Sequence, residues 1–195
     1  MIYIIRHGQT EGNAAKQLQG RSNRPLNDTG IEQAREAGRL LSEAGIAFSR
    51  VYTSPLVRAV QTADIVAEGV EQTQDDRLIE MDYGPYEGMS LNDPAPEVLT
   101  FFKDFAHNPA PAGMEPLDSI VSRMGSFLRD ICDVAACQDV LISTHAIALK
   151  GALEYLEPDA QGKYWSTYIG NCAVYVCDVN PDGNISAARE WGGAS

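Results

Sequence analysis

The sequence has no long apolar run, and its N-terminus has no targeting signal. No stretch of about 18 or more apolar residues occurs, so the sequence predicts no transmembrane helix. The first residues enter an apolar strand pattern without the basic region and apolar core of a secretory signal. We therefore expect a cytoplasmic protein with no membrane partner.

Basic residues are also scarce. Lysine and arginine together number 15 against 27 aspartates and glutamates, which gives a formal net charge of −12. Nucleic-acid backbones are bound by clustered basic side chains, so this balance argues against nucleic acid as the main partner. An anionic small molecule would need a locally positive pocket, because the overall field of the protein repels it.

Cysteine is present only as two pairs, Cys132 with Cys137 and Cys172 with Cys177. Residues five apart lie roughly 140° apart around a helix and on opposite faces of a strand. Neither arrangement suits a disulfide or a zinc knuckle. We expect four buried, reduced thiols and no metal site.

What the sequence does contain is enough apolar material for one core. The chain has 195 residues, of which 44% are hydrophobic. This length and content predict a single domain over residues 1–195. Periodicity and capping residues predict helices at Asp28 or Thr29 to about Ala44, from Ser54-Pro55 onward, and at Ser119 to about Ala136. Strands are predicted at Met1–Ile5, Arg50–Thr53 and Val140–Ile142. A terminal hairpin is predicted to pair Ala173–Cys177 with Ile185–Trp191.

Two segments between these elements have unusual compositions. Gln9–Asn27 is polar and rich in glycine, asparagine and glutamine, and we expect a long loop around the end of the first strand. Its basic residues, Lys16, Arg21 and Arg24, are interpreted as solvated charges that are also within reach of an anionic substrate. Prolines surround a short apolar segment within Asn92–Leu117, which predicts a small helical cap packed over the sheet.

The first strand runs directly into Arg6-His7-Gly8. Arginine offers a planar fork of donors that suits phosphate oxygens, and histidine offers a nitrogen that attacks or accepts a proton near neutral pH. Gly8 lets the backbone approach closely. A polar turn after a strand is the simpler interpretation of this tripeptide alone.

Two later residues are predicted to reach the same place. His145 follows the apolar run Val140–Ile142, which is typical of a buried parallel strand, and ligands of open α/β sheets bind beyond the carboxyl ends of such strands. Arg58 falls in the first turn of the helix predicted at Ser54-Pro55, where the positive end of the helix dipole adds to its charge. His107 has no matching motif and is interpreted as a surface residue.

Four separated motifs together resemble the histidine phosphatase superfamily, which includes phosphoglycerate mutases and many small phosphatases. The resemblance extends from Met1 to about Lys150, in the order of the family. It lies in the segments Arg6-His7-Gly8-Gln9-Thr10-Glu11-Gly12-Asn13, Ser54 to Ala63, Leu78-Ile79-Glu80 ahead of Gly84-Pro85-Tyr86-Glu87-Gly88, and Ser143-Thr144-His145. One residue departs from the pattern, since Ala146 stands where the family usually has glycine.

The resemblance implies a fold of three α/β/α layers, with a mostly parallel central sheet, helices on both faces and a small helical cap insertion at about residues 81–118. It also implies a phosphatase that hydrolyses small phosphorylated metabolites through a phosphohistidine, without metal or cofactor. The implied catalytic residues are His7, Glu80 and His145. The implied phosphate ligands are Arg6, Arg58, Asn13 and the backbone N–H of Gly8.

Some alternatives remain open at the level of sequence. Asp82 and Glu87 compete with Glu80 for the role of proton donor, and only the family pattern favours Glu80. Phosphoryl transfer of the mutase type uses the same His7, although the chain is shorter than the usual mutase. A phosphate-binding regulatory module without turnover is the third possibility, supported by Ala146 alone. The sequence indicates no oligomeric state.

Overall fold

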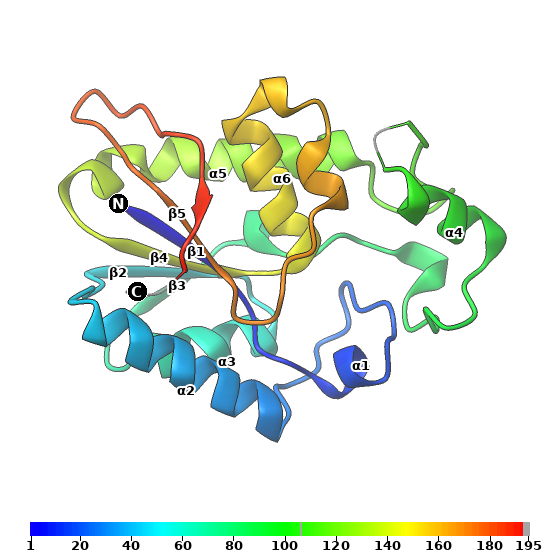
Figure 1. Cartoon of the computed structure of the whole chain (residues 1–195), viewed down its shortest axis with the longest axis horizontal. Coiled ribbons are helices and arrows are strands. Elements are labelled where there is room, and N and C mark those ends of the chain that lie inside the picture. Colours follow the sequence, from blue (N-terminus) through cyan, green and yellow to red (C-terminus); the bar gives the residue numbers. More distant parts are fainter. Residues whose placement is uncertain (106, 193–195) are drawn as a thin grey trace.

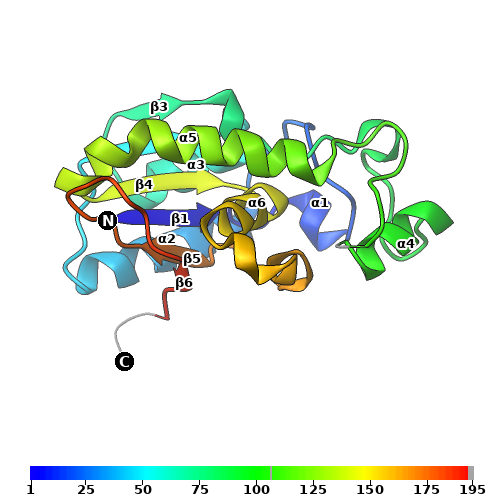
Figure 2. The same ribbon diagram turned by 90° about the horizontal axis from the view of Figure 1, so that it is seen from above.

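The computed structural model describes residues 1–105 and 107–192, and a six-stranded sheet forms its centre. The strands lie in the order β3-β2-β4-β1-β5-β6, with β3 and β6 at opposite edges (Figure 2). All neighbouring pairs from β3 to β1 are parallel, whereas β5 and β6 are antiparallel to their neighbours. The strands are β1 Ile2–Arg6, β2 Arg50–Thr53, β3 Gln72–Gln74, β4 Val140–Thr144, β5 Val174–Cys177 and β6 Arg189–Glu190.

Helices cover both faces of this sheet (Figure 1). The α-helices are α1 Glu11–Ala14, α2 Asp28–Glu43, α3 Val57–Val66, α4 Pro96–Lys103, α5 Leu117–Cys137 and α6 Ala146–Leu156. Short 3-10 turns are η1 Asp76–Leu78, η2 Gly84–Tyr86, η3 Pro158–Ala160 and η4 Lys163–Ser166. Helices α5 and α6 lie on one side of the sheet, and α2 and α3 lie on the other (Figure 1).

The alternation of side chains along β1 explains the two cores. Ile2 and Ile4 pack with the apolar faces of α5 and α6, whereas Tyr3 and Ile5 pack with α2 and α3. Every residue of β4 is buried, as expected for a strand covered on both faces. The predicted three-layer α/β/α fold with a mostly parallel sheet is confirmed.

Several predicted boundaries hold, and others are wrong. Helix α2 begins after its capping residue Asn27, whose side chain accepts a hydrogen bond from the Gly30 N–H, and it ends before Gly45, at φ +77°. The helix predicted at Ser54-Pro55 begins instead at Val57, because the backbone stays extended through its N-cap, Leu56. Ser54 thus does not cap this helix.

Two elements escaped prediction because they lack a strong hydrophobic signal, and one prediction of burial is wrong. Strand β3 consists of Gln72-Thr73-Gln74 at an exposed edge, where no apolar alternation marks it. The long loop contains a single helical turn, α1, held by a capping box between Thr10 and Asn13. Cys137 is exposed and only Cys177 is fully buried, so the prediction of four buried thiols is wrong.

The proline-rich segment places α4 beyond the carboxyl ends of β1 and β4, on the right in Figure 1. Phe101 is buried, and its ring contacts those of Phe102 and Phe105. Phe105 in turn stacks on Trp165 of η4. His107 is exposed and lies beside Asp104. Its interpretation as a surface residue is confirmed. Residue 106 of the predicted cap and residues 193–195 of the predicted domain lie outside the described part of the chain.

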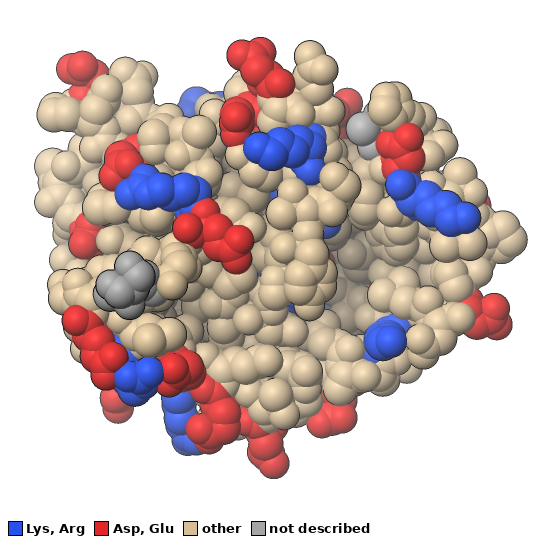
Figure 3. Space-filling model, viewed as in Figure 1, with Lys and Arg blue, Asp and Glu red and all other residues tan. Residues whose placement is uncertain are grey.

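The surface carries charges of both signs, and acidic side chains gather along the lower edge of the view in Figure 3. Helix α2 contributes exposed ion pairs there, including Arg39 with Glu36 and Glu43. A recess lies between the main body and the segment that contains α4 (Figure 3). Within residues 1–105 and 107–192, no helix is long and apolar enough to span a membrane, and no three His, Cys, Asp or Glu side chains converge as metal ligands do.

Candidate active site

The site forms where β1 and β4 end side by side. The two strands pair in parallel with Arg6 opposite Thr144, so the next residue of each, His7 and His145, leaves the sheet at the same edge. The two imidazole centroids are 5.1 Å apart, and both side chains are buried. Residues far apart in the sequence thus meet because parallel strands carry their carboxyl ends to one place.

The hydrogen bonds of His7 fix its tautomer. Its Nδ1 lies 2.6 Å from the Gly8 carbonyl oxygen, which can only accept, so Nδ1 carries the proton. The neutral ring then has its lone pair on Nε2, and this atom accepts a hydrogen bond from Arg58 Nε at 3.1 Å. The nitrogen that faces the site is therefore the nucleophilic one.

Arg58 connects both histidines to the polar loop. Its Nε also lies 3.2 Å from His145 Nδ1, so one N–H is shared between the two rings. Its Nη1 and Nη2 donate to the carbonyl oxygens of Ser22 and Gly20 at 2.7 and 2.8 Å. The side chain is fully buried, and this burial lowers the pKa of the guanidinium to about 10. It remains a cation at neutral pH.

Ser54 sets the orientation of the second histidine. Because Arg58 can only donate, His145 Nδ1 accepts, and in the neutral ring the proton lies on Nε2. That Nε2 is 2.7 Å from Ser54 Oγ, which accepts the hydrogen bond. The hydroxyl predicted to cap a helix instead positions His145, a role that only the contact between β2 and β4 reveals.

Burial lowers the pKa of both imidazoles well below the ordinary value of 6.5. The positive charges of Arg58 and Arg6 lower the pKa of His7 further, and the Gly8 carbonyl offsets part of this. Arg58 likewise lowers the pKa of His145. Both rings are therefore neutral at physiological pH, and Nε2 of His7 carries no proton.

We expect the ring NMR signals of His7 and His145 to keep the chemical shifts of the neutral form as the pH is lowered through 6.5. A depressed pKa means that protonation begins only at more acidic pH, whereas the same residues in urea should titrate near about 6.5. Assignment follows from the His7→Ala spectrum. Midpoints at or above the unfolded value would contradict the buried, cation-flanked environment.

Arg6 is a second cation of the site, and one of its N–H groups makes no hydrogen bond within the described residues. Its Nη1 donates to the Ile169 carbonyl at 2.5 Å. Its Nε is buried and has no hydrogen-bond partner among the described residues. Burial lowers the pKa of Arg6, and the charge of Glu80 partly restores it. A buried donor without a partner is costly, so this N–H is suited to an incoming acceptor.

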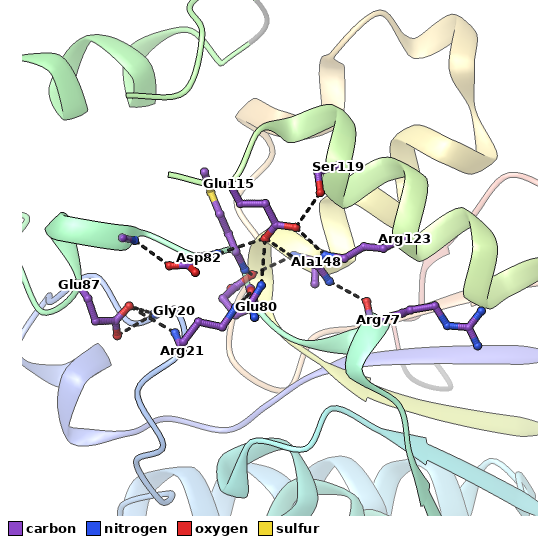
Figure 4. A network of polar contacts seen from close by, with 12 residues as sticks. Gly20, Arg21, Arg77, Glu80, Asp82, Glu87, Glu115, Ser119, Arg123 and Ala148 are labelled. Carbon is purple, nitrogen blue, oxygen red and sulfur yellow. Dashed lines mark hydrogen bonds and ion pairs between the residues drawn. The ribbon is translucent and has the colours of Figure 1, made fainter. Parts of the chain in front are cut away.

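The Glu80 carboxylate lies at the N-terminus of α6, the helix that follows His145. Its Oε1 accepts hydrogen bonds from the N–H groups of Met81 at 2.9 Å and Ala148 at 3.0 Å, and its Oε2 accepts from Ile147 at 3.2 Å. The side chain is only 4% exposed. Figure 4 shows Glu80 within a wider network of polar contacts.

The two competing carboxylates are used differently. Asp82 caps a local turn by accepting from the Gly84 N–H at 2.8 Å. Glu87 accepts from the N–H groups of Gly20 and Arg21 (Figure 4). It also accepts from the Ser22 N–H, in the loop whose carbonyls hold Arg58. Both are half-buried, whereas Glu80 is fully buried and adjoins α6. The geometry favours Glu80 over these neighbours.

The two remaining predicted ligands hold the turn together. Asn13 caps α1 through its side-chain oxygen, which also lies 3.4 Å from Asn171 Nδ2. The Gly8 N–H donates to Thr62 Oγ1 at 3.1 Å, so that a phosphate contact through this N–H would have to displace the hydroxyl. A Cβ on Gly8 would lie 2.4 Å from the Gly30 carbonyl oxygen, which shows that the glycine is required for packing against α2.

Three residues near the site were not predicted from the sequence. Thr62 accepts from Gly8 and donates to the Arg58 carbonyl, which ties the β1 turn to α3. Asn171 Nδ2 donates to the His7 carbonyl at 3.0 Å. Lys150 is a half-buried cation in the otherwise apolar first half of α6, and burial lowers its pKa to about 8 despite the charge of Glu80. Of these three residues, only Lys150 had a signal in the sequence, as a single lysine among the apolar residues of a helix.

Ala146 does not strain the turn after His145. It is the first residue of α6, with a right-handed helical conformation that alanine adopts readily. Within the described part of the chain, the residues with positive φ other than glycine are Lys16, Gln161 and Cys172. This position therefore does not require the conformational freedom of glycine.

A buried histidine thus lies at the end of each of two neighbouring strands of an α/β sheet, and one arginine donates to both rings. A family model described as the histidine phosphatase superfamily, branch 1, matches residues 2–191. The chain belongs to this superfamily, as its motifs indicated.

Individual relatives include both phosphatases and mutase-like proteins. Phosphoglycerate mutase-like protein 4 of Arabidopsis thaliana is 33% identical over 202 residues, which cover 100% of this chain and 85% of the relative. The uncharacterised phosphatase PhoE of Bacillus subtilis is 32% identical over 154 residues, covering 78% of this chain and 75% of PhoE. A mycobacterial glucosyl-3-phosphoglycerate phosphatase, solved with VO3, shares the fold with a TM-score of 0.84, 22% identity and 99% coverage of both chains.

Proposed function

We propose that the chain is a phosphatase that hydrolyses small phosphate monoesters through a phosphohistidine on His7. The observation that carries the proposal is the unprotonated Nε2 of His7, buried beside the Arg58 guanidinium and a second histidine. A neutral imidazole nitrogen aimed at a cationic pocket is the arrangement needed for attack on an anionic phosphoryl group.

In the first step, His7 Nε2 attacks phosphorus in line with the ester oxygen. The N–P bond forms, the P–O bond to the alcohol breaks, and the departing oxygen takes a proton from Glu80. The His7 Nδ1–H bond to the Gly8 carbonyl disperses the positive charge that develops on the ring. The product is a phosphohistidine and a free alcohol.

In the second step, water attacks phosphorus and transfers a proton to Glu80. The N–P bond breaks, inorganic phosphate leaves, and His7 and Glu80 return to their initial states. Glu80 serves both steps because the leaving alcohol and the attacking water occupy the same side of the phosphoryl group.

Arg6, Arg58 and His145 surround the transferred group in this proposal. Two N–H groups can donate to its equatorial oxygens: the Arg6 Nε–H, which has no partner among the described residues, and the Arg58 Nε–H, which the two histidines share. Two guanidinium groups supply the positive charge that metal ions provide in other phosphoryl-transfer sites, so the mechanism calls for no metal. The same two charges locally offset the repulsion between an anionic substrate and a protein of net charge −12.

A phosphoglycerate mutase-type transfer is the second candidate, favoured by the name of the Arabidopsis relative. It would use the same phosphohistidine but return the phosphoryl group to a bound acceptor. Chain length does not separate the two candidates, because a 2,3-bisphosphoglycerate-dependent phosphoglycerate mutase of Azorhizobium caulinodans, 29% identical, matches over 97% of both chains. The release of inorganic phosphate is what distinguishes them. A non-catalytic phosphate-binding module is a third candidate, and Ala146, its one support, fits the helix without strain.

The purified protein should release inorganic phosphate from an activated aryl phosphate, and a panel of phosphorylated metabolites should then identify the natural substrate class. Activity should survive EDTA, because the cations in the site are arginines. Vanadate should inhibit it as a mimic of the transferred group. Activity that is lost in EDTA and restored by zinc or magnesium would overturn the metal-free mechanism, and transfer to a second metabolite without phosphate release would favour the mutase.

A further inference from the structure

The backbone on both sides of Glu80 is held by two residues outside the site, Glu115 and Arg123 (Figure 4). Arg123 Nη1 donates to the Arg77 carbonyl at 2.6 Å, three residues before Glu80. Glu115 Oε2 accepts from the Asp82 N–H at 3.2 Å, and the Glu115 N–H donates to the Asp82 carbonyl at 2.8 Å. The segment that carries Glu80 is thus fixed at each end.

Glu115 and Arg123 also bind each other through two parallel hydrogen bonds. Arg123 Nε and Glu115 Oε1 are 2.9 Å apart, and Arg123 Nη2 and Glu115 Oε2 are 3.3 Å apart. Ser119 Oγ donates to the same carboxylate at 3.2 Å. Such a fork fixes direction as well as distance, so the pair acts as one rigid unit.

A third arm of the network reaches Glu80 itself. Arg21 Nε donates to the Glu80 carbonyl at 3.1 Å, and its Nη2 lies 3.5 Å from Glu115 Oε2. The Glu80 carboxylate is held by backbone N–H groups of Met81 and α6. Its position therefore depends on how the Arg77 to Asp82 backbone lies against α6.

Stability alone does not account for this ion pair. The side chains of Arg123 and Glu115 are only 14% and 10% exposed. Removing two charges from water costs about as much as their attraction returns, and apolar residues of similar size often stabilise a fold as well or better. Directional contacts with the backbone around Glu80 are what an apolar pair could not supply.

We propose that Glu115 and Arg123 are positioning residues that hold Glu80 at the reacting ester oxygen. Glu115 ends the segment that carries α4, and Arg123 lies on α5, so the brace joins the end of the cap to the proton donor. The inference rests on the proposed function, in which Glu80 transfers the proton. Neither residue is assigned contact with the substrate.

The test compares kcat/KM for an alkyl phosphate, which needs a proton donor, with that for an activated aryl phosphate, which does not. Glu115→Gln should lose on the order of 10²-fold on the alkyl ester, as expected for a misplaced catalytic group, and much less on the aryl ester. Arg123→Lys keeps the positive charge but removes the two parallel hydrogen bonds to Glu115, and it should lose activity on the alkyl ester selectively but to a smaller extent. Arg39→Gln, which breaks two exposed ion pairs on α2, should leave the ratio unchanged.

A double-variant cycle separates positioning from general damage. In the Glu80→Gln background, Glu115→Gln should add no further loss specific to the alkyl ester, because the two changes act on one step. Equal losses on both esters, accompanied by a lower Tm, would show a structural role and overturn the inference. If Glu80→Gln itself shows no selectivity, the proton-donor assignment falls and this inference with it. If Glu80→Gln is selective and Glu115→Gln is not, the inference alone fails.

Discussion

The His7→Ala protein is expected to lose at least about 10⁴-fold in kcat for phosphate monoesters, the scale seen when a nucleophile is removed from a unit of cooperating groups. The alanine has no acceptor for the phosphoryl group, so both chemical steps of the proposed route disappear. Arg6, Arg58 and His145 would still bind phosphate, and substrate affinity should change far less than turnover. Rapid-quench kinetics with labelled substrate measures both the covalent intermediate and turnover.

The intermediate itself provides the more specific readout. The wild-type protein should form an acid-labile, base-stable phosphoenzyme, and peptide mapping should place it on His7. The His107→Ala protein, which lacks the exposed histidine, serves as the matched control and should label fully. Labelling of the His7→Ala protein together with near-normal turnover would place the nucleophile elsewhere.

The Glu80→Gln protein is expected to lose on the order of 10²–10⁴-fold in kcat/KM on an alkyl phosphate, the usual contribution of a positioned proton donor. An alkoxide must be protonated as it leaves, whereas an activated phenolate leaves without help. The loss on an activated aryl phosphate should therefore be much smaller. Glutamine keeps the size of the side chain and one oxygen, which can accept from the Met81 and Ala148 N–H groups, whereas its NH2 would face the Ile147 N–H.

Asp82→Asn and Glu87→Gln are the controls for this assignment. Glu87 supports the loop that holds Arg58, so its loss should lower activity on both esters to a similar extent. Asp82 caps a turn, and its replacement should affect neither ester selectively. A selective loss on the alkyl ester in either control, or equal losses in Glu80→Gln, would move proton transfer to another residue.

The sequence determined the layers of the fold and the place of the two histidines. Apolar runs at β1 and β4 and an amphipathic α5 report burial directly, since side chains repeat at fixed periods in strands and helices. A histidine directly after each buried strand could therefore be placed at one edge of the sheet before any contact was known. Arg58 was found the same way, because its position in the first turn of α3 depends on local sequence alone.

Only the tertiary structure decided how these groups are held. Ser54 looked like a helix cap, yet its hydroxyl binds His145, because the pairing of β2 with β4 brings together residues 91 positions apart. The tautomer of His7 and the brace of Glu115 with Arg123 around Glu80 likewise depend on hydrogen bonds between segments distant in the chain. Periodicity carries no information about such contacts, since a hydrogen bond depends on distance and direction in space.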